Sequence, residues 1–464
     1  MTTELFVQLC YLVSSVLFIL GLKGLADAKT ARRGVLYAEL GMAIAVVGTL
    51  LRHEIVNYHW IALGAVVGAV LGTIISLRIP MTMMPERIAF SHAFGGLAVA
   101  LVGVSEYWHF QLEGLTMDTL QITATGFEVL FGALTFTGSL MAFGKLQGIL
   151  PGRPLTFPGQ NAANAGLIAA ALGMVGYLIA YPNAGAVFYT SVALALLIGV
   201  SLVLPIGGAD MPVVICLLNS YAGLAAAATG FALKNNVLII CGALDGGSGF
   251  ILGMMMSKAM NRSFSNVLFG AFGAVADSGA QKALSTGPAP NVASVEDAVD
   301  VLKAARSLIV VPGYGMAVSQ AQHAVRDLAA ALKANGCEVK YAIHPVAGRM
   351  PGHMNVLLAE ANVPYDQLYD LDQINDEFTA TDVALVVGAN DVVNPAARTD
   401  TASPIYGMPI LAADAAKSCI VLKRSLNPGF AGIENGLFVR PNTMLVLGDA
   451  KKTIVAFTTG MREG

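Results

Sequence analysis

Charged residues are scarce in this sequence: Asp, Glu, Lys and Arg together make up 12% of the 464 residues, whereas hydrophobic residues make up 55%. This composition excludes a single soluble domain and predicts that most of the chain lies in lipid. An excess of basic residues is also lacking, because the formal net charge is -3. Nucleic acid is therefore not an expected partner.

Paired cysteines and a cleavable leader are missing as well. The five cysteines lie far apart without a CxxC spacing, which favours reduced, buried thiols over a disulfide framework or a metal site. The N-terminal Met-Thr-Thr-Glu has no basic region before its apolar run, and no convincing small-residue cleavage site follows. We therefore expect a retained first membrane span.

The first half of the chain contains long apolar runs. Each is about 20 residues long, enough to cross a bilayer as a helix. They cover residues 4–26, 34–52, 59–79, 88–106, 122–145, 162–181, 186–206, 211–233 and 237–258. The sequence thus predicts a polytopic α-helical membrane domain of about nine spans.

The loops between these runs differ in charge. An odd number of spans places the chain ends on opposite sides, and ten Lys or Arg residues fall on the side that includes the C-terminus. Only Arg52 and Lys234 fall on the other side, which also carries the aromatic residues of an interfacial belt, such as Trp60 and Trp108. Basic loops favour the cytoplasmic side, so we expect a periplasmic N-terminus and a cytoplasmic C-terminus.

A second domain is predicted after a linker rich in Ala, Gly, Ser and Pro. We place the membrane domain at 1–265, the linker at 266–293 and the second domain at 294–464. Ser294 and Asp297 predict a capping box, and a helix is expected over 318–334. Strand-like runs occur at 308–311, 338–343, 382–387, 419–422 and 444–447. Their alternation with helices predicts a Rossmann-like α/β fold with a parallel sheet.

A glycine turn follows the first of these strands. Its residues are Gly313, Tyr314, Gly315, Met316, Ala317 and Val318. Two glycines between a strand and a helix are typical of a dinucleotide site, because backbone N–H groups can approach phosphate oxygens there. The third glycine of that motif is replaced by valine, so the turn alone fits an ordinary tight turn equally well.

Three further loops follow strand ends and strengthen this hypothesis. Open α/β sheets bind ligands at the carboxyl ends of their strands, where all these loops are expected to meet. The loops are Val346, Ala347, Gly348, Arg349, Met350 and Pro351; Gly388, Ala389, Asn390 and Asp391; and Lys423, Arg424 and Ser425.

The chemistry of these loops favours NADP(H) over NAD(H). The end of the second strand lacks the carboxylate that would hold a ribose 2′-hydroxyl and reads Ala-Ile-His-Pro instead. Lys423 and Arg424, with the Ser425 hydroxyl, suit a 2′-phosphate. An isolated pair of basic residues at a strand end would more often be solvated only. Lys423 and Arg424, however, are expected to lie among the other ligand-type loops, and this position favours binding of a phosphate.

Polar residues inside the spans are the other functional candidates, because ionisable groups in lipid are costly. His92 can titrate near neutral pH, and the alternative is a neutral imidazole that hydrogen-bonds between helices. Asn219 can orient an imidazole or a water, or simply join helices. Glu128 and Asp245 are intramembrane carboxylates that could relay protons. Asp210 stands before Met-Pro at a span start, as helix caps commonly do.

The chain resembles the beta subunits of proton-translocating NAD(P) transhydrogenases over essentially its whole length. In the C-terminal domain the resemblance rests on 313–318, 344–351, 355–361, 388–394, 423–425 and 448–452. In the membrane domain it rests on 207–212 (GGADMP), 218–221 (LNSY) and 258–263 (KAMNRS).

The resemblance implies an enzyme of two chains in a bacterial inner membrane. This chain would bind NADP(H), in an orientation reversed relative to ordinary Rossmann proteins, and an alpha subunit would carry NAD(H). It likewise implies a dimer of alpha–beta units. It implies that His92 lies in the proton path, that Asp210 takes part in coupling to the NADP(H) domain, and that Asp391 belongs to a nucleotide loop. Further implied contacts come from a covering loop, with phenylalanine where the family often has tyrosine, and from the last strand end. These residues are Asn427, Gly429, Phe430, Ala431, Gly448, Asp449, Ala450 and Lys451.

Two other functions remain open from the residues alone. A transporter or channel gated by a nucleotide-sensing domain would have the same spans, linker and glycine turn. A self-contained membrane dehydrogenase would need a quinone, flavin or haem site, and neither paired haem histidines nor a second nucleotide turn is found in the sequence.

Overall fold

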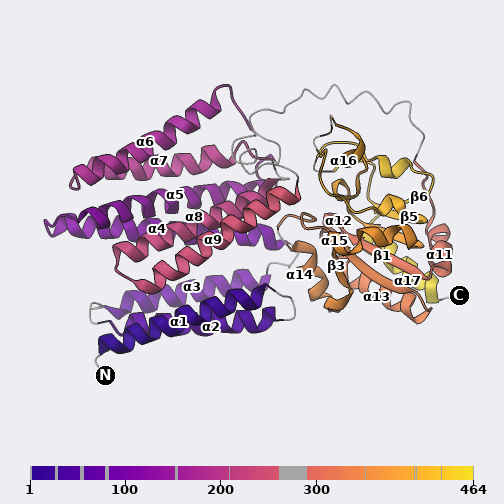
Figure 1. Ribbon diagram of the computed structural model, residues 1–464, viewed down its shortest axis with the longest axis horizontal. Helices are drawn as coiled ribbons and strands as arrows, with labels where there is room; N and C mark the ends of the chain where they lie inside the picture. The colour runs from indigo at the N-terminus through magenta and orange to yellow at the C-terminus, as the bar shows by residue number, and fades with distance from the viewer. Residues whose placement is uncertain are drawn as a thin grey trace. The chain divides into compact units, whose positions relative to one another are not determined.

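A computed structural model describes the chain over most of its length. The described residues are 3–26, 30–52, 57–78, 83–151, 155–207, 210–260, 290–350, 352–401, 403, 405–429 and 431–462. The chain divides into a membrane unit, residues 1–206 with 214–253, and an α/β unit, residues 207–213 with 254–464. The predicted linker at 266–293 lies outside the described residues as far as 289. Figure 1 shows the helices and strands of each unit.

Within the described ranges, nine helices are long and apolar enough to cross a membrane, as the sequence predicted. They are α1 (Thr3–Leu25), α2 (Ala31–Leu50), α3 (Tyr58–Arg78), α4 (Met84–Leu112), α5 (Thr119–Leu146), α6 (Gln160–Ala180), α7 (Gly185–Val203), α8 (Met211–Ala232) and α9 (Asn236–Ala259).

Small residues let several of these helices approach closely. Gly96 on α4 faces the backbone of α5 so tightly that a Cβ there would lie 2.9 Å from the Gly132 carbonyl oxygen. Gly223 on α8 faces Gly246 on α9 in the same way, because a Cβ on Gly223 would lie 2.2 Å from the Gly246 nitrogen. Lipid supplies no hydrophobic force between helices, so such packing holds the bundle together. Helix α5 is the most buried span and contacts α4, α6 and α7.

The α/β unit contains one six-stranded sheet in which every strand is parallel to its neighbours. Its order is β3-β2-β1-β4-β5-β6. The strands are β1 (Ser307–Pro312), β2 (Glu338–Ile343), β3 (Leu368–Asp370), β4 (Val383–Val387), β5 (Ser418–Lys423) and β6 (Thr443–Leu447). The order reverses between β1 and β4, the point at which open α/β sheets bind ligands. The predicted fold class is confirmed.

The two faces of the sheet are covered differently. Helices α11 (Val295–Ala304), α13 (Gln322–Ala334) and α17 (Ala450–Arg462) contact strands or one another (Figure 1). The opposite face packs its apolar side chains, such as Val311 and Val386, against short segments around Phe378, Leu411 and Phe438. The residues of one strand alternate between these faces, as the period of two requires.

The structure differs from the prediction at two elements. Strand β3 was not predicted, because three residues are too short to show an alternating pattern. The helix expected over 318–334 begins four residues later, as α13 at Gln322, and a separate short helix, α12 (Tyr314–Val318), precedes it. Gln320 between them has a φ of 51°, a left-handed conformation that interrupts the helical backbone. The capping box of α11 is confirmed, with the Asp297 N–H donating to Ser294 Oγ over 3.1 Å.

Candidate functional site

Four loops meet at the carboxyl edge of the sheet, around a cavity of about 270 Å³. They follow β1, β4, β5 and β6, which are neighbours in the sheet. The cavity is lined by Gly315, Val318, Ser319, Gly388, Ala389, Asn390, Leu422, Lys423, Arg424, Ser425, Asn427, Pro428, Gly429, Gly448 and Ala450. A larger groove of about 510 Å³, lined by Gly336 and Glu338 among others, lies at the amino end of β2, where such sheets do not bind ligands.

The glycine turn after β1 is locked to the loop after β4. The Gly313 N–H donates to the Val387 carbonyl and the Gly315 N–H to the Gly388 carbonyl, both over 2.9 Å. A Cβ on Gly313 would lie 2.4 Å from Ala389 Cα, and Gly388 has a φ of 66°. The glycines are thus required by two backbones in contact. Their contact shapes the cavity wall at the point where the strand order reverses.

Two cations lie at the end of β5 on the cavity wall. Lys423 Nζ lies 4.6 Å from the centre of the Phe438 ring and donates to the Asn427 carbonyl. Burial lowers the pKa of Lys423, and the charge of Asp391 opposes that shift. Arg424 is largely exposed, and its guanidinium lies 3.5 Å from an oxygen of Asp449. Lys423 therefore fixes the following segment, whereas Arg424 presents charge to the solvent side of the cavity.

Asp391 contacts Gly429 and Ala431 of the segment 427–431, in which Phe430 lies outside the described residues. Its Oδ2 accepts a hydrogen bond from the Ala431 N–H over 3.0 Å. A Cβ on Gly429 would lie 2.6 Å from Asp391 Oδ1, so a larger residue there would have to displace the Asp391 carboxylate. Asn435 donates to both the backbone and the side-chain oxygen of Asn390, over 2.9 Å each. The loop after β4 therefore contacts this segment at Gly429 and Ala431 and binds Asn435, which lies beyond it.

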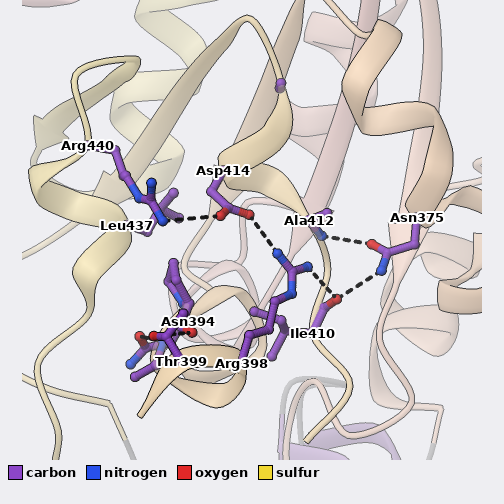
Figure 2. A network of polar contacts seen from close by, with 12 residues as sticks. Asn375, Asn394, Arg398, Thr399, Ile410, Ala412, Asp414, Leu437 and Arg440 are labelled. Atoms are coloured by element: carbon purple, nitrogen blue, oxygen red, sulfur yellow. Dashed lines mark hydrogen bonds and ion pairs between the residues drawn. The ribbon is translucent and has the colours of Figure 1, made fainter. Parts of the chain in front are cut away.

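A polar network fixes the long connection between β4 and β5, as Figure 2 shows. Arg398 and Arg440 reach the two oxygens of Asp414 over 3.2 and 3.7 Å. Asn375 accepts from the Ala412 N–H over 2.8 Å and donates to the Ile410 carbonyl over 3.1 Å. The buried Asn394, near Asp391 in the chain, donates to the Glu434 carbonyl over 3.0 Å. The network therefore steadies the loop that carries Asp391.

The loop after β2 is organised by two buried histidines. His344 Nε2–H donates to the Pro409 carbonyl over 2.7 Å, and its Nδ1 accepts from the Val346 N–H over 3.2 Å. His353 Nδ1 accepts from the Arg349 N–H over 3.1 Å. The Arg349 guanidinium lies 4.2 Å from the centre of the Tyr314 ring, a cation–π contact. This loop therefore lies against the glycine turn.

The neutral form of His344 is required by these bonds, because protonated Nδ1 could not accept from Val346. Burial lowers the pKa of His344 from 6.5 to about 4. Folding stability from this group is thus complete above pH 6.5 and is lost as the pH falls from 6.5 towards 4. The loss should approach about 3 kcal/mol, the free energy equivalent of that pKa difference.

This pH dependence is testable by thermal unfolding of the purified chain. We expect the unfolding temperature of the α/β unit to fall between pH 6.5 and 4, and His344→Gln to flatten that fall. The control is His323→Gln, which changes an exposed histidine on α13 and should leave the pH dependence of the unfolding temperature unchanged. An equal fall in wild type and His344→Gln would contradict the assignment.

Not all predicted cofactor residues line the cavity. Those that do are Gly315, Val318, Gly388, Ala389, Asn390, Lys423, Arg424, Ser425, Asn427, Gly429, Gly448 and Ala450. The other described residues of the prediction are not among its lining residues: Gly313, Tyr314, Met316, Ala317, the loop 346–350, Asp391, Ala431, Asp449 and Lys451. Met316 and Ala317 are fully buried in the core. Pro351 and Phe430 lie outside the described residues.

Sequence reasoning did not identify some residues around the cavity. Ser319, Leu422 and Pro428 line it. Ser319 lies in the unpredicted break after α12, and Leu422 was read only as a strand residue. Pro428 falls within the covering loop that the resemblance implied, although it was not named as a contact. Asn435 anchors that loop without any signal in the sequence.

Polar groups in the membrane unit form two pairs. His92 Nδ1 on α4 lies 3.0 Å from Ser139 Oγ on α5, and His92 Nε2 has no hydrogen-bond partner among the described residues. Asn219 Nδ2 on α8 donates to Asp245 Oδ1 on α9 over 3.0 Å. Asp245, a candidate for proton relay in the sequence, is thus paired with a second predicted residue. Asp210, which directly precedes α8, is grouped with the α/β unit, and its N–H donates to the Gly207 carbonyl over 3.0 Å.

Comparison with known proteins identifies one family across both units. A family model described as the NAD(P) transhydrogenase beta subunit matches residues 7–459. Two similar proteins, each called NAD(P) transhydrogenase subunit beta, come from Rhodospirillum rubrum and from a named strain of that species. Each is 47% identical over 446 residues, which cover 95% of this chain and 96% of the relative.

Proposed function

Since the chain belongs to the NAD(P) transhydrogenase beta subunit family, we propose that its α/β unit binds NADP(H) and that its membrane unit carries protons past His92. The chain is the beta subunit of a proton-translocating transhydrogenase and a multi-pass membrane protein. Its partner is an alpha subunit, which in this proposal carries NAD(H). The complex would be a dimer of alpha–beta units in a bacterial inner membrane, with the α/β unit in the cytoplasm.

The observation that carries the nucleotide proposal is the convergence of four strand-end loops on one cavity with Lys423 and Arg424 in its wall. A volume of about 270 Å³ is just below the range of about 300–1,000 Å³ usual for small-molecule sites. It therefore suits one end of a dinucleotide rather than the whole. We place the 2′-phosphate end near Lys423, Arg424 and Ser425, because charge-assisted hydrogen bonds favour it there.

Bound NADP(H) would supply the nicotinamide that gives or accepts the hydride. The residues of this chain need only orient it and exclude water, since hydride passes directly between two nicotinamides. The segment 427–431, held by Asp391 and Lys423, would cover the nucleotide. Proton passage must alter the relative affinity for NADP+ and NADPH, or the docking geometry, because coupling requires differential binding. We propose that Asp210 links His92 to the α/β unit.

The test is reconstitution of this chain with its alpha subunit in sealed vesicles. We expect reduction of an NAD analogue by NADPH to move protons across the membrane, and a protonophore to abolish the resulting gradient. A gated transporter would instead move a solute without hydride transfer. Absence of both hydride transfer and proton movement would refute the proposal.

Preference for the 2′-phosphate is tested by replacing Arg424 with glutamine. Loss of one charged hydrogen bond costs about 1.5–3 kcal/mol, so NADPH affinity should fall roughly 10- to 100-fold while weak NADH binding stays unchanged. Binding is measured calorimetrically on the purified chain without its alpha subunit, so that NADH cannot bind at the site proposed for that subunit. The control is Lys303→Gln, which removes one exposed positive charge from α11. Equal losses for NADPH and NADH would contradict the placement.

A further inference from the structure

Glu128 is a carboxylic acid fully buried in the membrane unit, and the path through His92 does not account for it. It lies on α5, nine residues after the start of that helix, with none of its surface exposed. Neither carboxyl oxygen has a hydrogen-bond partner of normal geometry among the described residues. Ionisable residues buried within a membrane span are costly, so an unaccounted acid there calls for a role.

Glu128 shares one face of α5 with Ser139, the partner of His92. The two residues are eleven positions apart, which brings them within about 20° of the same direction after three helical turns. The same spacing separates them by about 16 Å along the helix axis. Glu128 therefore lies on the helix face that carries Ser139, nearer the N-terminal end of α5.

Helix α4 shows the matching arrangement. His92 faces Ser139, and Gly103, eleven positions further along α4, faces Glu128. A Cβ on Gly103 would lie 3.1 Å from the Glu128 carboxyl carbon, so the absence of a side chain there leaves room for the acid. The α4–α5 seam thus has two levels, one with His92 and one with Glu128.

Polar groups continue between and around these two levels. Thr135 lies on the same face of α5, seven residues from Glu128 and four from Ser139, and is fully buried. Its hydroxyl oxygen has no hydrogen-bond partner in the described part of the chain. Threonine hydroxyls that are not committed to a backbone carbonyl can pass a proton along a hydrogen-bonded chain or hold a water between two levels.

The other groups facing Glu128 favour a proton-carrying role over a fixed ion pair. The Thr229 hydroxyl on α8 interacts with the carboxyl, but it donates its own proton to the Ala225 carbonyl over 3.0 Å. Thr229 can therefore accept from a protonated Glu128 and cannot donate to an ionised one in this arrangement. The remaining charged group that interacts with it is another acid, Glu106 on α4. No cation is among these neighbours.

We propose that Glu128 is a second proton-binding group of the translocation path, connected to His92 along the seam between α4 and α5 through Thr135. The step is proton transfer alone: an O–H bond forms on the Glu128 carboxylate as a bond to hydrogen breaks on the donor. This inference rests on the path through His92 proposed above. It adds a group about 16 Å further along the helix axis, so that a proton crosses that distance in two stages.

The test compares variants of this chain reconstituted with the alpha subunit in vesicles. Glu128→Gln keeps the size and hydrogen-bonding shape of the side chain but cannot release a proton. We expect proton-linked hydride transfer to fall at least 10-fold, while NADPH binding is unchanged. Glu128→Asp should restore most of the rate. Glu113→Gln, the same exchange at the exposed end of α4, is the matched control and should have no effect.

Infrared difference spectra between the NADP+ and NADPH complexes provide a readout that does not depend on turnover. A carboxyl C=O band that changes in wild type should vanish in Glu128→Gln and shift in Glu128→Asp. If Glu128→Gln fails to assemble, the band in wild type and Glu128→Asp decides alone, and an unshifted band overturns the proposal. The proposal is also overturned if Glu128→Gln assembles and transfers hydride at the wild-type rate with the wild-type proton-to-hydride ratio. If His92→Ala loses coupling while Glu128→Gln keeps wild-type coupling, the role of Glu128 is refuted and the proposed path through His92 stands.

Discussion

Replacing His92 with alanine is expected to lower proton-linked hydride transfer at least about 100-fold, the usual cost of losing a positioned acid–base group. His92 Nδ1 is engaged by Ser139, so Nε2 is the nitrogen left to take up and release a proton. Alanine removes both nitrogens. NADPH binding by the α/β unit should persist, because the site described there contains no residue of α4.

The measurement is proton movement and hydride transfer in the same vesicles, each with and without a protonophore. His109→Ala is the control, since this histidine lies on the same helix at its exposed end, 3.3 Å from Glu113. Ser139→Ala should give an intermediate loss, because it leaves the imidazole in place without its partner. Retention of the full proton-to-hydride ratio in His92→Ala would remove His92 from the path.

Membrane spans and glycine turns were predictable because each follows from local chemistry. A helix in lipid must be apolar over about 20 residues, so all nine spans could be read directly from the sequence. A strand followed by two glycines predicts a tight turn near a ligand edge. Both features depend on residues that are neighbours in the chain.

Features that depend on distant residues were not predictable. The sequence did not pair Asp245 with Asn219, yet α8 and α9 bring these two residues together although they are 26 positions apart. Gly313 was interpreted as a phosphate contact, whereas the structure shows a second reason for glycine, the backbone of Ala389. The position of Glu128 opposite Gly103 is of the same kind. In each case the deciding contact joins two elements, and a single sequence carries no signal for that pairing.

The second large effect is expected at Asp391, which joins three parts of the nucleotide site. Its carboxylate accepts from the Ala431 N–H, lies against Gly429, and interacts electrostatically with Lys423. Asp391→Ala removes the acceptor and the charge together. We expect the segment 427–431 to lose its anchor, with NADPH affinity falling roughly 10- to 100-fold, as for other charged hydrogen bonds of about 1.5–3 kcal/mol.

Asp391→Asn separates the two contributions. Asparagine keeps an oxygen that can accept from Ala431 but carries no charge. If anchoring alone matters, Asp391→Asn should bind NADPH nearly as wild type does and transfer hydride at a similar rate. If the negative charge takes part in coupling, Asp391→Asn should still bind NADPH but lose proton-linked hydride transfer.

We expect the second outcome, because a charge that faces Lys423 inside the site provides a means by which a proton could change nucleotide affinity. Binding by calorimetry and coupled transfer in vesicles measure the two properties independently. Asp366→Asn changes an exposed acid in the short helix that precedes the edge strand β3; it is the control and should change neither property. Normal coupling in Asp391→Asn would limit Asp391 to holding the covering segment, and normal binding in Asp391→Ala would exclude even that role.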